Sequence, residues 1–255
     1  MAPNLTEILF ALGLEEIIAG VTIHSDYPPA AEKKPKMGTF WQPNIEAVIA
    51  AEPDLVITLG FEQQRNLAKR LKASGCGILT VNIEKVSDLF GAIAKIGEAT
   101  KTTQKADQLI LNIKKELDGL AAMFDPTETV RVLWVIQTEP LRVAGRETFV
   151  NEIITLASGE NAIGPTLHQY PPIGTEQLYS CGADVIITPA QGREELSKQQ
   201  QKALKFWSRF KSVPAVKNKR IYVIDPGPVS RLGPRLPRAV KNVAECLRPE
   251  LFDKK

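Results

Sequence analysis

The stretch from Lys101 to Phe124 constrains the fold of this 255-residue chain more than any other. Its apolar residues recur at steps that place them on one helical face, and charged residues fill the opposite face. The apolar positions are Ala106, Leu109, Ile110, Ile113, Leu117, Leu120, Ala121 and Phe124. About 22 helical residues give a rod of about 33 Å, the diameter of a small domain. We therefore predict a stiff helix that connects two lobes; one surface helix on a single sheet is the alternative.

Strand and helix signals alternate on both sides of this stretch. The predicted strands are Ile17–Ile23, Leu55–Leu59, Ile78–Val81, Val130–Ile136, Val185–Thr188 and Arg220–Ile224. The predicted helices are Asn44–Ala51, Gln63–Ala73, Val86–Glu98, Phe149–Ala157, Thr175–Ser180, Lys198–Phe210 and Pro234–Leu247, the last with Pro234 in its first turn. Such alternation is typical of βαβ units and parallel sheets. We predict an α/β protein with two Rossmann-like lobes, 1–100 and 125–255, joined by a single long backbone helix at 101–124.

A 15-residue pattern occurs once on each side of the predicted connecting helix. Residues 44–58 read NIEAVIAAEPDLVIT, and residues 174–188 read GTEQLYSCGADVIIT. In both, a Glu precedes an Asp by eight residues, and three aliphatic residues and a Thr follow the Asp. Each copy is typical of a short helix, a tight turn and a buried strand. The shared register favours two similar lobes over chance coincidence.

The formal charge of +3 is unevenly distributed along the chain. Residues 1–100 carry a net charge of −3, residues 101–128 carry −1, and residues 129–255 carry +7. The basic second half suits an anionic ligand, although most of these charges are typical of a solvated surface. The basic residues are scattered and lack interleaved aromatic residues on one element, so nucleic acid is not an expected partner.

The start of the chain bears on its location. No apolar run reaches the roughly 18 residues of a membrane span. No signal peptide is visible, and the chain opens directly on an amphipathic helix that Asn4 or Thr6 would cap. So abrupt a start suggests a trimmed chain, and a missing signal therefore does not indicate a cytoplasmic protein.

No signature of enzyme chemistry is visible. The chain has no P-loop, no GxSxG, no HExxH and no GxGxxG after a strand. Its two histidines, His24 and His168, have no carboxylate at a spacing that indicates acid–base catalysis. Cys76, Cys181 and Cys246 form no CxxC or Cys/His cluster, which excludes an ordinary structural zinc site but leaves both one disulfide and three free thiols open. We expect no catalytic residue, no metal and no cofactor; a bilobal enzyme is the remote alternative.

The loops that follow the predicted strands are candidate ligand contacts, because ligands of open parallel sheets bind beyond the carboxyl ends of the strands. These loops are His24–Trp41, Leu59–Glu62, Gln137–Arg146, Pro189–Arg193 and Asp225–Arg235, and Thr166–Ile173 is added to them. They contain Tyr27, Phe40, Trp41, Phe61, Tyr170 and Arg231. Aromatic residues on two facing sets of loops would line a cleft for a large, flat or hydrophobic ligand. For each of these aromatic residues, the alternative is that its side chain only packs its loop against the sheet.

Seven segments carry a resemblance to a known family. In order along the chain they are APNLTEILFALGL, DYPPAA, WQPNIEAVIAAEPDLVIT, PLRVAGRETFVNEIITLASGENAIG, YPPIGTEQL, VPAVKNKRIYVID and RLGPRLPRAVKNVAECL. Over essentially its whole length the chain resembles the solute-binding proteins of ABC importers for cobalamin, ferric siderophores and haem. The resemblance implies two α/β lobes joined by one long helix, with a small-molecule ligand between them. It also implies a monomer that is periplasmic or anchored outside the cytoplasm, with permease subunits as partners.

The DYPP segment and the Trp-Gln-x-Asn-like segment after it are most similar to the cobalamin-binding branch. The ligand contacts that this resemblance implies are Pro28, Phe40 or Trp41, the Leu59–Phe61 turn, Leu141 or Arg142, Tyr170 and Arg231. Tyr170 stands where that branch places an aromatic residue against the corrin, and Arg231 stands where it places a basic one on the second lobe. A corrinoid is therefore the expected ligand. A ferric siderophore or haem is the alternative, which the basic second half favours because such chelates are anionic.

The resemblance also predicts how the chain meets its permease. The family docks through one surface carboxylate on each lobe. In this chain the first position falls at Glu62, and the second falls at Ser230, which is not acidic.

Overall fold

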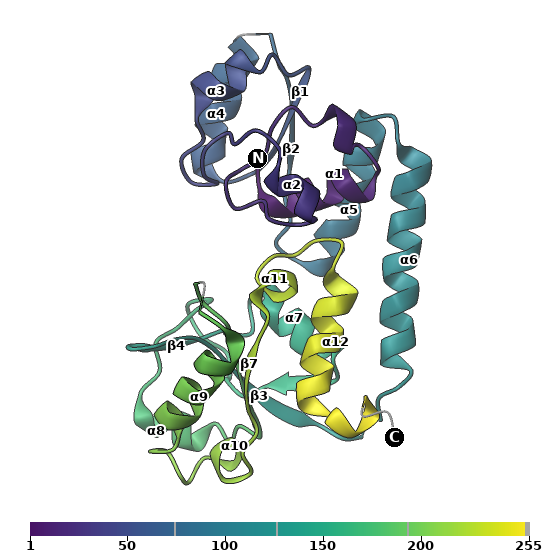
Figure 1. Cartoon of the computed structure of the whole chain (residues 1–255). Helices are drawn as coiled ribbons and strands as arrows, with labels where there is room; N and C mark the ends of the chain where they lie inside the picture. The colour runs from purple at the N-terminus through teal and green to yellow at the C-terminus, as the bar shows by residue number, and fades with distance from the viewer. Residues whose placement is uncertain (74, 126, 193, 253–255) are drawn as a thin grey trace. The chain divides into compact units, whose positions relative to one another are not determined.

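The computed structural model describes residues 1–73, 75–125, 127–192 and 194–252, with the backbone alone at 62–64, 66, 67 and 73. The chain divides into two compact units (Figure 1). The first unit is Met1–Lys114 with Arg231–Pro234, and the second is Lys115–Ser230 with Arg235–Lys255. The boundary therefore falls inside the long helix, and no sequence pattern predicted that Arg231–Pro234 belong with the first unit.

The first unit is built around two parallel strands. Its elements are α1 (Pro3–Ala11), η1 (Glu15–Ile17), α2 (Pro29–Glu32), α3 (Ile45–Ala50), β1 (Leu55–Leu59), α4 (Glu62–Ala73), β2 (Gly77–Val81), α5 (Val86–Ala99) and the first part of α6 (Thr103–Ala121). β1 and β2 pair in parallel from Leu55–Gly77 to Leu59–Val81. Val56, Ile57 and Leu59 are buried, as expected for an aliphatic parallel strand that is covered on both faces.

The second unit contains a five-stranded sheet. Its elements are the end of α6, β3 (Val130–Thr138), β4 (Leu141–Val143), α7 (Phe149–Leu156), β5 (Gly159–Asn161), α8 (Thr175–Ser180), β6 (Val185–Pro189), α9 (Leu196–Trp207), α10 (Pro214–Lys217), β7 (Ile221–Ile224), α11 (Pro226–Val229), α12 (Leu236–Leu247) and η2 (Pro249–Leu251). The strand order is β4-β3-β6-β7, and β5 pairs with β3. The β3–β5, β3–β6 and β6–β7 pairs are parallel, whereas β4 is antiparallel to β3. The α/β prediction is confirmed, with one antiparallel strand added.

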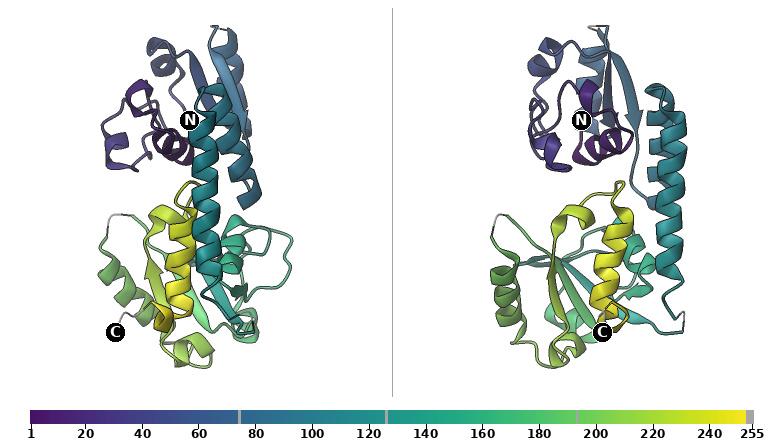
Figure 2. Two further views of the ribbon diagram at one scale, coloured as in Figure 1. Left: turned by 90° about the vertical axis from the view of Figure 1, so that its right-hand side faces the viewer. Right: turned by 45° about the vertical axis from the view of Figure 1, so that its right-hand side comes forward.

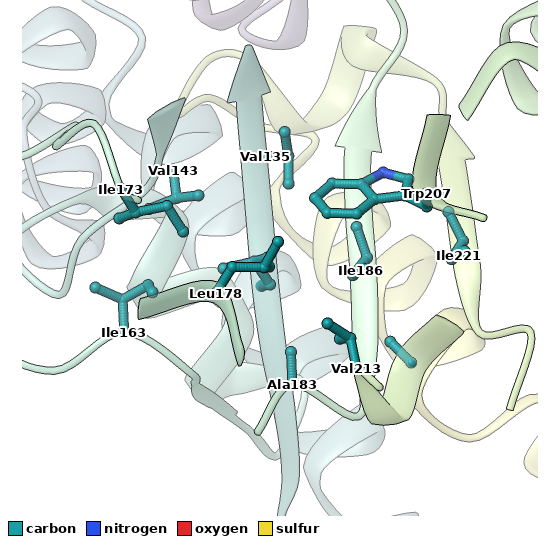
Figure 3. Close-up of a cluster of buried hydrophobic side chains, with 12 residues drawn as sticks. Val135, Val143, Ile163, Ile173, Leu178, Ala183, Ile186, Trp207, Val213 and Ile221 are labelled. Carbon is teal, nitrogen blue, oxygen red and sulfur yellow. The ribbon is translucent and has the colours of Figure 1, made fainter. Parts of the chain in front are cut away.

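Helices cover both faces of the second unit's sheet, with α9 on one side and α12 on the other (Figure 2). On the α9 side, Trp207 packs over Val135 and Ile186, and Leu178 of α8 fills the space beside it (Figure 3). Because side chains alternate between the faces of a strand, Trp134 of β3 belongs to the opposite face. Both tryptophans are at most 1% exposed.

The predicted connecting stretch forms α6, which has 19 residues and so is about 29 Å long rather than 33 Å. Its first part lies in the first unit and its last turns lie in the second. Ala106 and Ile113 on the predicted apolar face are buried, while Leu111 on the other face is 59% exposed. The periodicity therefore identified the correct face.

The repeated sequence pattern forms the same structural unit twice. α3 and α8 each have six residues, and β1 and β6 each begin ten residues after the corresponding helix begins. Val48 of α3 and Leu178 of α8 occupy equivalent positions and are 3% and 1% exposed. The prediction of two similar helix–turn–strand units is confirmed.

Three local predictions are wrong. Ile17–Ile23 forms no strand: Ile17 ends η1, and Val21 makes a single parallel bridge with Lys36. Neither Asn4 nor Thr6 caps α1, because the helix already begins at Pro3, whose fixed φ suits a first turn. Pro234 precedes α12, which begins at Leu236 and carries Pro237 in its first turn.

The three cysteines, which the sequence left open, are free thiols. Cys246 is buried in α12, and burial raises the pKa of its thiol to about 12. Burial also raises the thiol pKa values of Cys76 and Cys181.

The crossing of α5 and α6 in the first unit yields a stability prediction. A Cβ at Gly97 of α5 would overlap the Cβ of the buried Ala106 on α6. Gly97→Ala is therefore expected to lower the free energy of unfolding by about 1–3 kcal/mol through overpacking. Gly91 of the same helix is exposed, and no described heavy atom lies within 4 Å of a Cβ built there.

Gly91→Ala is the matched control, and it is expected to raise the free energy of unfolding by about 0.5–1 kcal/mol because alanine restricts the unfolded chain. Urea unfolding of both variants measures the two effects. Equal stabilisation by the two substitutions would contradict the close approach of α5 and α6.

Candidate ligand-binding site

An aromatic cluster in the first unit combines Phe40 and Trp41, which precede α3, with Phe61, which follows β1. The ring centroid of Phe40 lies 4.7 Å from that of Trp41 and 5.4 Å from that of Phe61, both in edge-on geometry. A turn closed by the Thr39 and Gln42 backbones presents the first two rings. Trp41 and Phe61 are 60% and 40% exposed. Exposed, mutually packed rings beyond the end of a parallel strand form a suitable platform for a flat ligand.

Tyr27 and Pro28, the other first-lobe predictions, precede α2. Pro28 follows a cis peptide bond and takes the N-cap position of α2. Tyr27 is 38% exposed.

Arg231 belongs to the first unit, not to the second lobe where it was predicted. Its guanidinium forms a two-point hydrogen bond with the Asp26 carboxylate, at 2.9 and 3.4 Å. The Glu7 carboxylate, only 2% exposed, lies 3.7 Å from the same guanidinium. Asn4 donates to the Leu232 carbonyl at 3.1 Å and also holds this segment. Because buried charges require partners, the Arg231 charge is already balanced by two carboxylates.

The second unit contains a hollow at the carboxyl ends of β3 and β6, with a volume of about 330 Å³. We call it the Tyr170 hollow. Its lining residues are Trp134, Ile136, Phe149, Val150, Tyr170, Pro189, Ala190, Gln191, Val229 and Ser230. Trp134 and Ile136 are two positions apart on β3 and so share a strand face. The volume lies at the lower end of the roughly 300–1,000 Å³ of small-molecule pockets.

Arg142 positions the loop that carries Tyr170. Its guanidinium donates to the Tyr170 carbonyl at 3.3 Å, and its backbone makes an antiparallel bridge with Pro172. Leu141 accepts a hydrogen bond from the Ile173 amide and packs against the α9-side core. Neither Arg142 nor Leu141 is among the described lining residues of the hollow; both hold the loop that carries Tyr170.

Burial raises the pKa of the Tyr170 phenol above its ordinary value of 10. The folded state therefore favours the neutral phenol, and this contribution to stability is present below about pH 10 and lost as the pH rises through the raised pKa. We expect Tyr170→Phe to remove the corresponding ionisation step from a spectrophotometric titration of the folded protein above pH 10. Loss of a step at the ordinary tyrosine pKa of about 10, rather than at a higher pH, would contradict burial of this phenol.

The described lining of the Tyr170 hollow contains no formally charged side chain. Tyr170 is neutral at physiological pH, and the polar groups of Gln191, Ser230 and Trp134 are uncharged. Gln191 also donates its side-chain amide to the Ile136 carbonyl at 2.7 Å, which links two lining residues. Such a surface suits an apolar ligand with neutral polar substituents.

The two predicted docking residues differ in what the structure shows. Ser230 is exposed and lines the Tyr170 hollow. Glu62 begins α4, and its side chain lies outside the described part of the chain.

Several lining residues were not singled out in the sequence. Trp134 and Ile136 were treated only as part of a strand, and Phe149 and Val150 only as the start of a helix. Strand alternation placed Trp134 and Ile136 on one face, near the carboxyl end where ligands bind. That combination was the signal that could have identified them.

A second hollow, of about 380 Å³, lies in the first unit against Leu55, Val56 and Ile57 of β1. Its described lining is mostly aliphatic and, apart from Met37, includes no residue of the predicted ligand loops. It is therefore separate from the candidate site. Within the described residues, no group of three His, Cys, Asp or Glu side chains is arranged to hold a metal ion.

Comparison with known proteins places the chain in a family. The family model described as "Periplasmic binding protein" matches residues 1–228. The chain is 31% identical over 259 residues to an "Uncharacterized ABC transporter substrate-binding lipoprotein YvrC" of Bacillus subtilis, covering 99% of this chain and 80% of the relative. It is 26% identical over 246 residues to a "Vitamin B12-binding protein" of Vibrio parahaemolyticus, covering 96% of this chain and 86% of that protein.

A solved structure agrees with these relatives. The periplasmic heme-binding protein BhuT, in complex with two hemes, matches with a TM-score of 0.86 and 25% identity, over 98% of this chain and 97% of BhuT. None of the helices in the described ranges is both long enough and apolar enough to cross a membrane. Members of the family are substrate-binding transport proteins rather than enzymes, and relatives are periplasmic proteins or lipoproteins. The chain belongs to the periplasmic binding protein family, in the class that serves ABC importers.

Proposed function

We propose that this chain binds a corrinoid and delivers it to the permease of an ABC importer. The observation that carries the choice of ligand is the Tyr170 hollow, whose described lining is aromatic, aliphatic and uncharged. A corrin macrocycle is large and flat, and its side groups end mainly in neutral carboxamides. Haem carries carboxylates, and ferric catecholates are anionic, so both would need cationic partners. The similarity to a vitamin B12-binding protein supports the same choice.

The state of Arg231 also supports a neutral ligand. A free guanidinium would attract an anionic chelate, but this one is engaged by Asp26 and Glu7. Net attraction for an anion at that position is therefore small.

Haem or a ferric siderophore is the second candidate. The net charge of +7 in residues 129–255 and the similarity to a heme-binding protein favour it. A thermal-shift panel with cyanocobalamin, haemin and a ferric catecholate distinguishes the candidates. A ligand at about 100 times its Kd stabilises the folded state by about 2.7 kcal/mol. We expect cyanocobalamin alone to raise the melting temperature; a shift only with an anionic chelate would reject the corrinoid.

We further propose that docking on the permease uses Glu46 and Glu176; Glu62 and Ser230, which the resemblance implies, are the alternative pair. Glu46 and Glu176 occupy the same position of the repeated unit, in the first turns of α3 and α8, and both are exposed. The buried anchors Val48 and Leu178 lie two residues later, about 200° around the helix, so each carboxylate faces outward.

This choice places one surface carboxylate on each unit, which is the arrangement that the resemblance implies for docking. Two outward carboxylates on matched elements suit a permease that presents two cationic side chains. Ser230, by contrast, lacks a charge and lines the Tyr170 hollow.

A further inference from the structure

The loop after β6 is held in place by a side chain of α9. The Gln199 carboxamide accepts a hydrogen bond from the Gln191 backbone amide and donates one to the Gln191 carbonyl, both at 2.9 Å. The same amide nitrogen also donates to the Glu194 carbonyl at 2.8 Å. On the strand side, the Ala190 amide donates to the Ile224 carbonyl of β7 at 2.9 Å. The backbone on which the Gln191 side chain stands is therefore fixed from both sides.

The fixed backbone gives the Gln191 side chain a defined orientation. Its Nε2 donates to the Ile136 carbonyl, near the carboxyl end of β3, at 2.7 Å. Because a carbonyl oxygen can only accept, the nitrogen of the carboxamide faces Ile136, and Oε1 takes the other arm of the planar group. The Gln191 side chain thus presents an acceptor oxygen whose direction is set by two independent sets of hydrogen bonds.

The Gln191 carboxamide is accessible from the Tyr170 hollow. The hydrogen bond between Gln191 and Ile136 joins two lining residues, so this carboxamide lies in the wall of the hollow. Gln191 is also solvent-exposed, unlike a group that is sealed in the core. A ligand in the hollow can therefore reach Oε1 without any rearrangement of the sheet.

Gln200, the next residue of α9, provides an internal comparison. Its Nε2 donates to the Ile221 carbonyl and its Oε1 accepts from the Val223 amide, both at 2.7 Å. Gln200 therefore holds the backbone of β7 much as Gln199 holds the loop after β6. Neither Gln200 nor the two residues that it binds are among the described lining residues of the Tyr170 hollow.

We propose that Oε1 of Gln191 accepts a hydrogen bond from a primary carboxamide of the ligand, and that Gln199 is the positioning residue that orients it. This assignment rests on the proposed function and deepens it. A carboxamide offers N–H donors, whereas a carboxylate has only acceptor oxygens. A carboxylate at this position would leave Oε1 without a donor and bring two negative oxygen atoms together, which disfavours it. Gln191 is therefore a specificity-determining residue that selects carboxamides over carboxylates.

The test is calorimetric titration with cyanocobalamin and with its monocarboxylic acid derivatives, in each of which one side-group carboxamide is replaced by a carboxylate. We expect the wild-type protein to bind at least one derivative about tenfold more weakly than cyanocobalamin, as the loss of one hydrogen bond predicts. This ratio is expected to fall to within twofold in Gln191→Ala, because the acceptor that distinguishes the two groups is gone. Equal wild-type affinity for cyanocobalamin and every derivative would overturn the assignment, and so would a ratio that Gln191→Ala leaves unchanged.

Gln199→Ala and Gln200→Ala separate positioning from a general effect on stability. Each substitution removes a carboxamide of α9 that holds backbone groups, but only Gln199 holds the loop of Gln191. We expect Gln199→Ala to lose the discrimination between carboxamide and carboxylate and Gln200→Ala to keep it. The same result for both variants would contradict the positioning role. Absence of cyanocobalamin binding by the wild-type protein would instead reject the corrinoid proposal itself, and Gln191 as its acceptor with it.

Discussion

Replacing Tyr170 by alanine is expected to weaken cyanocobalamin binding by about 30-fold or more. Tyr170 lines the hollow at the carboxyl ends of β3 and β6, and Arg142 fixes its loop. Truncating a large aromatic anchor in a pocket typically costs about 2 kcal/mol or more of binding free energy, which corresponds to about 30-fold. Calorimetric titration of the variant measures the loss directly.

Two control variants test whether the loss of affinity is specific to the aromatic ring of Tyr170. Tyr179→Ala removes a 43%-exposed tyrosine of α8 that packs near Phe210 and is not part of the Tyr170 hollow, so it should bind like the wild type. Tyr170→Phe keeps the ring and should retain most of the affinity. Equal affinities of Tyr170→Ala and Tyr179→Ala would show that the hollow does not contact the ligand.

The double substitution Glu46→Gln, Glu176→Gln is expected to abolish delivery while leaving cyanocobalamin affinity in solution unchanged. Truncating one partner of a hydrogen-bonded charge pair costs about 2 kcal/mol or more, so two losses weaken association with the importer by about 900-fold or more. Binding to the importer in lipid nanodiscs and uptake of labelled cobalamin into proteoliposomes measure the two consequences.

The matched control for docking is Glu16→Gln, Glu116→Gln. These carboxylates are also exposed, one in each unit, but neither lies in the repeated helix–turn–strand unit. If the Glu46→Gln, Glu176→Gln variant docks like the wild type and Glu62→Gln docks poorly, the proposal is wrong. Glu62, which the resemblance implied, would then be the docking carboxylate of the first unit.

Elements with a strong local pattern were predictable from the sequence. β1 begins and ends where its aliphatic run does, and α8 has its predicted bounds. The repeated helix–turn–strand unit could be recognised in the sequence because its three parts are contiguous in the chain. The three-residue strands β4 and β5 were missed because so few residues carry no detectable period.

Features that depend on distant partners were not predictable. Ile17–Ile23 has strand-forming residues, but only Val21 finds a backbone partner, so the strand does not form. Arg231 was assigned to the second lobe from its position in the chain, yet it pairs with Glu7, more than 200 residues earlier. The sequence named Tyr170 but not Trp134, because strand alternation identifies a face without showing that a hollow lies on it.

The most direct test of the central proposal is calorimetric titration of cyanocobalamin into the wild-type protein. We predict one site per chain with a Kd at or below about 1 µM, which corresponds to about −8.2 kcal/mol. No detectable binding at about 100 µM ligand, equivalent to an affinity weaker than about −5.5 kcal/mol, would contradict the assignment of a corrinoid to this protein.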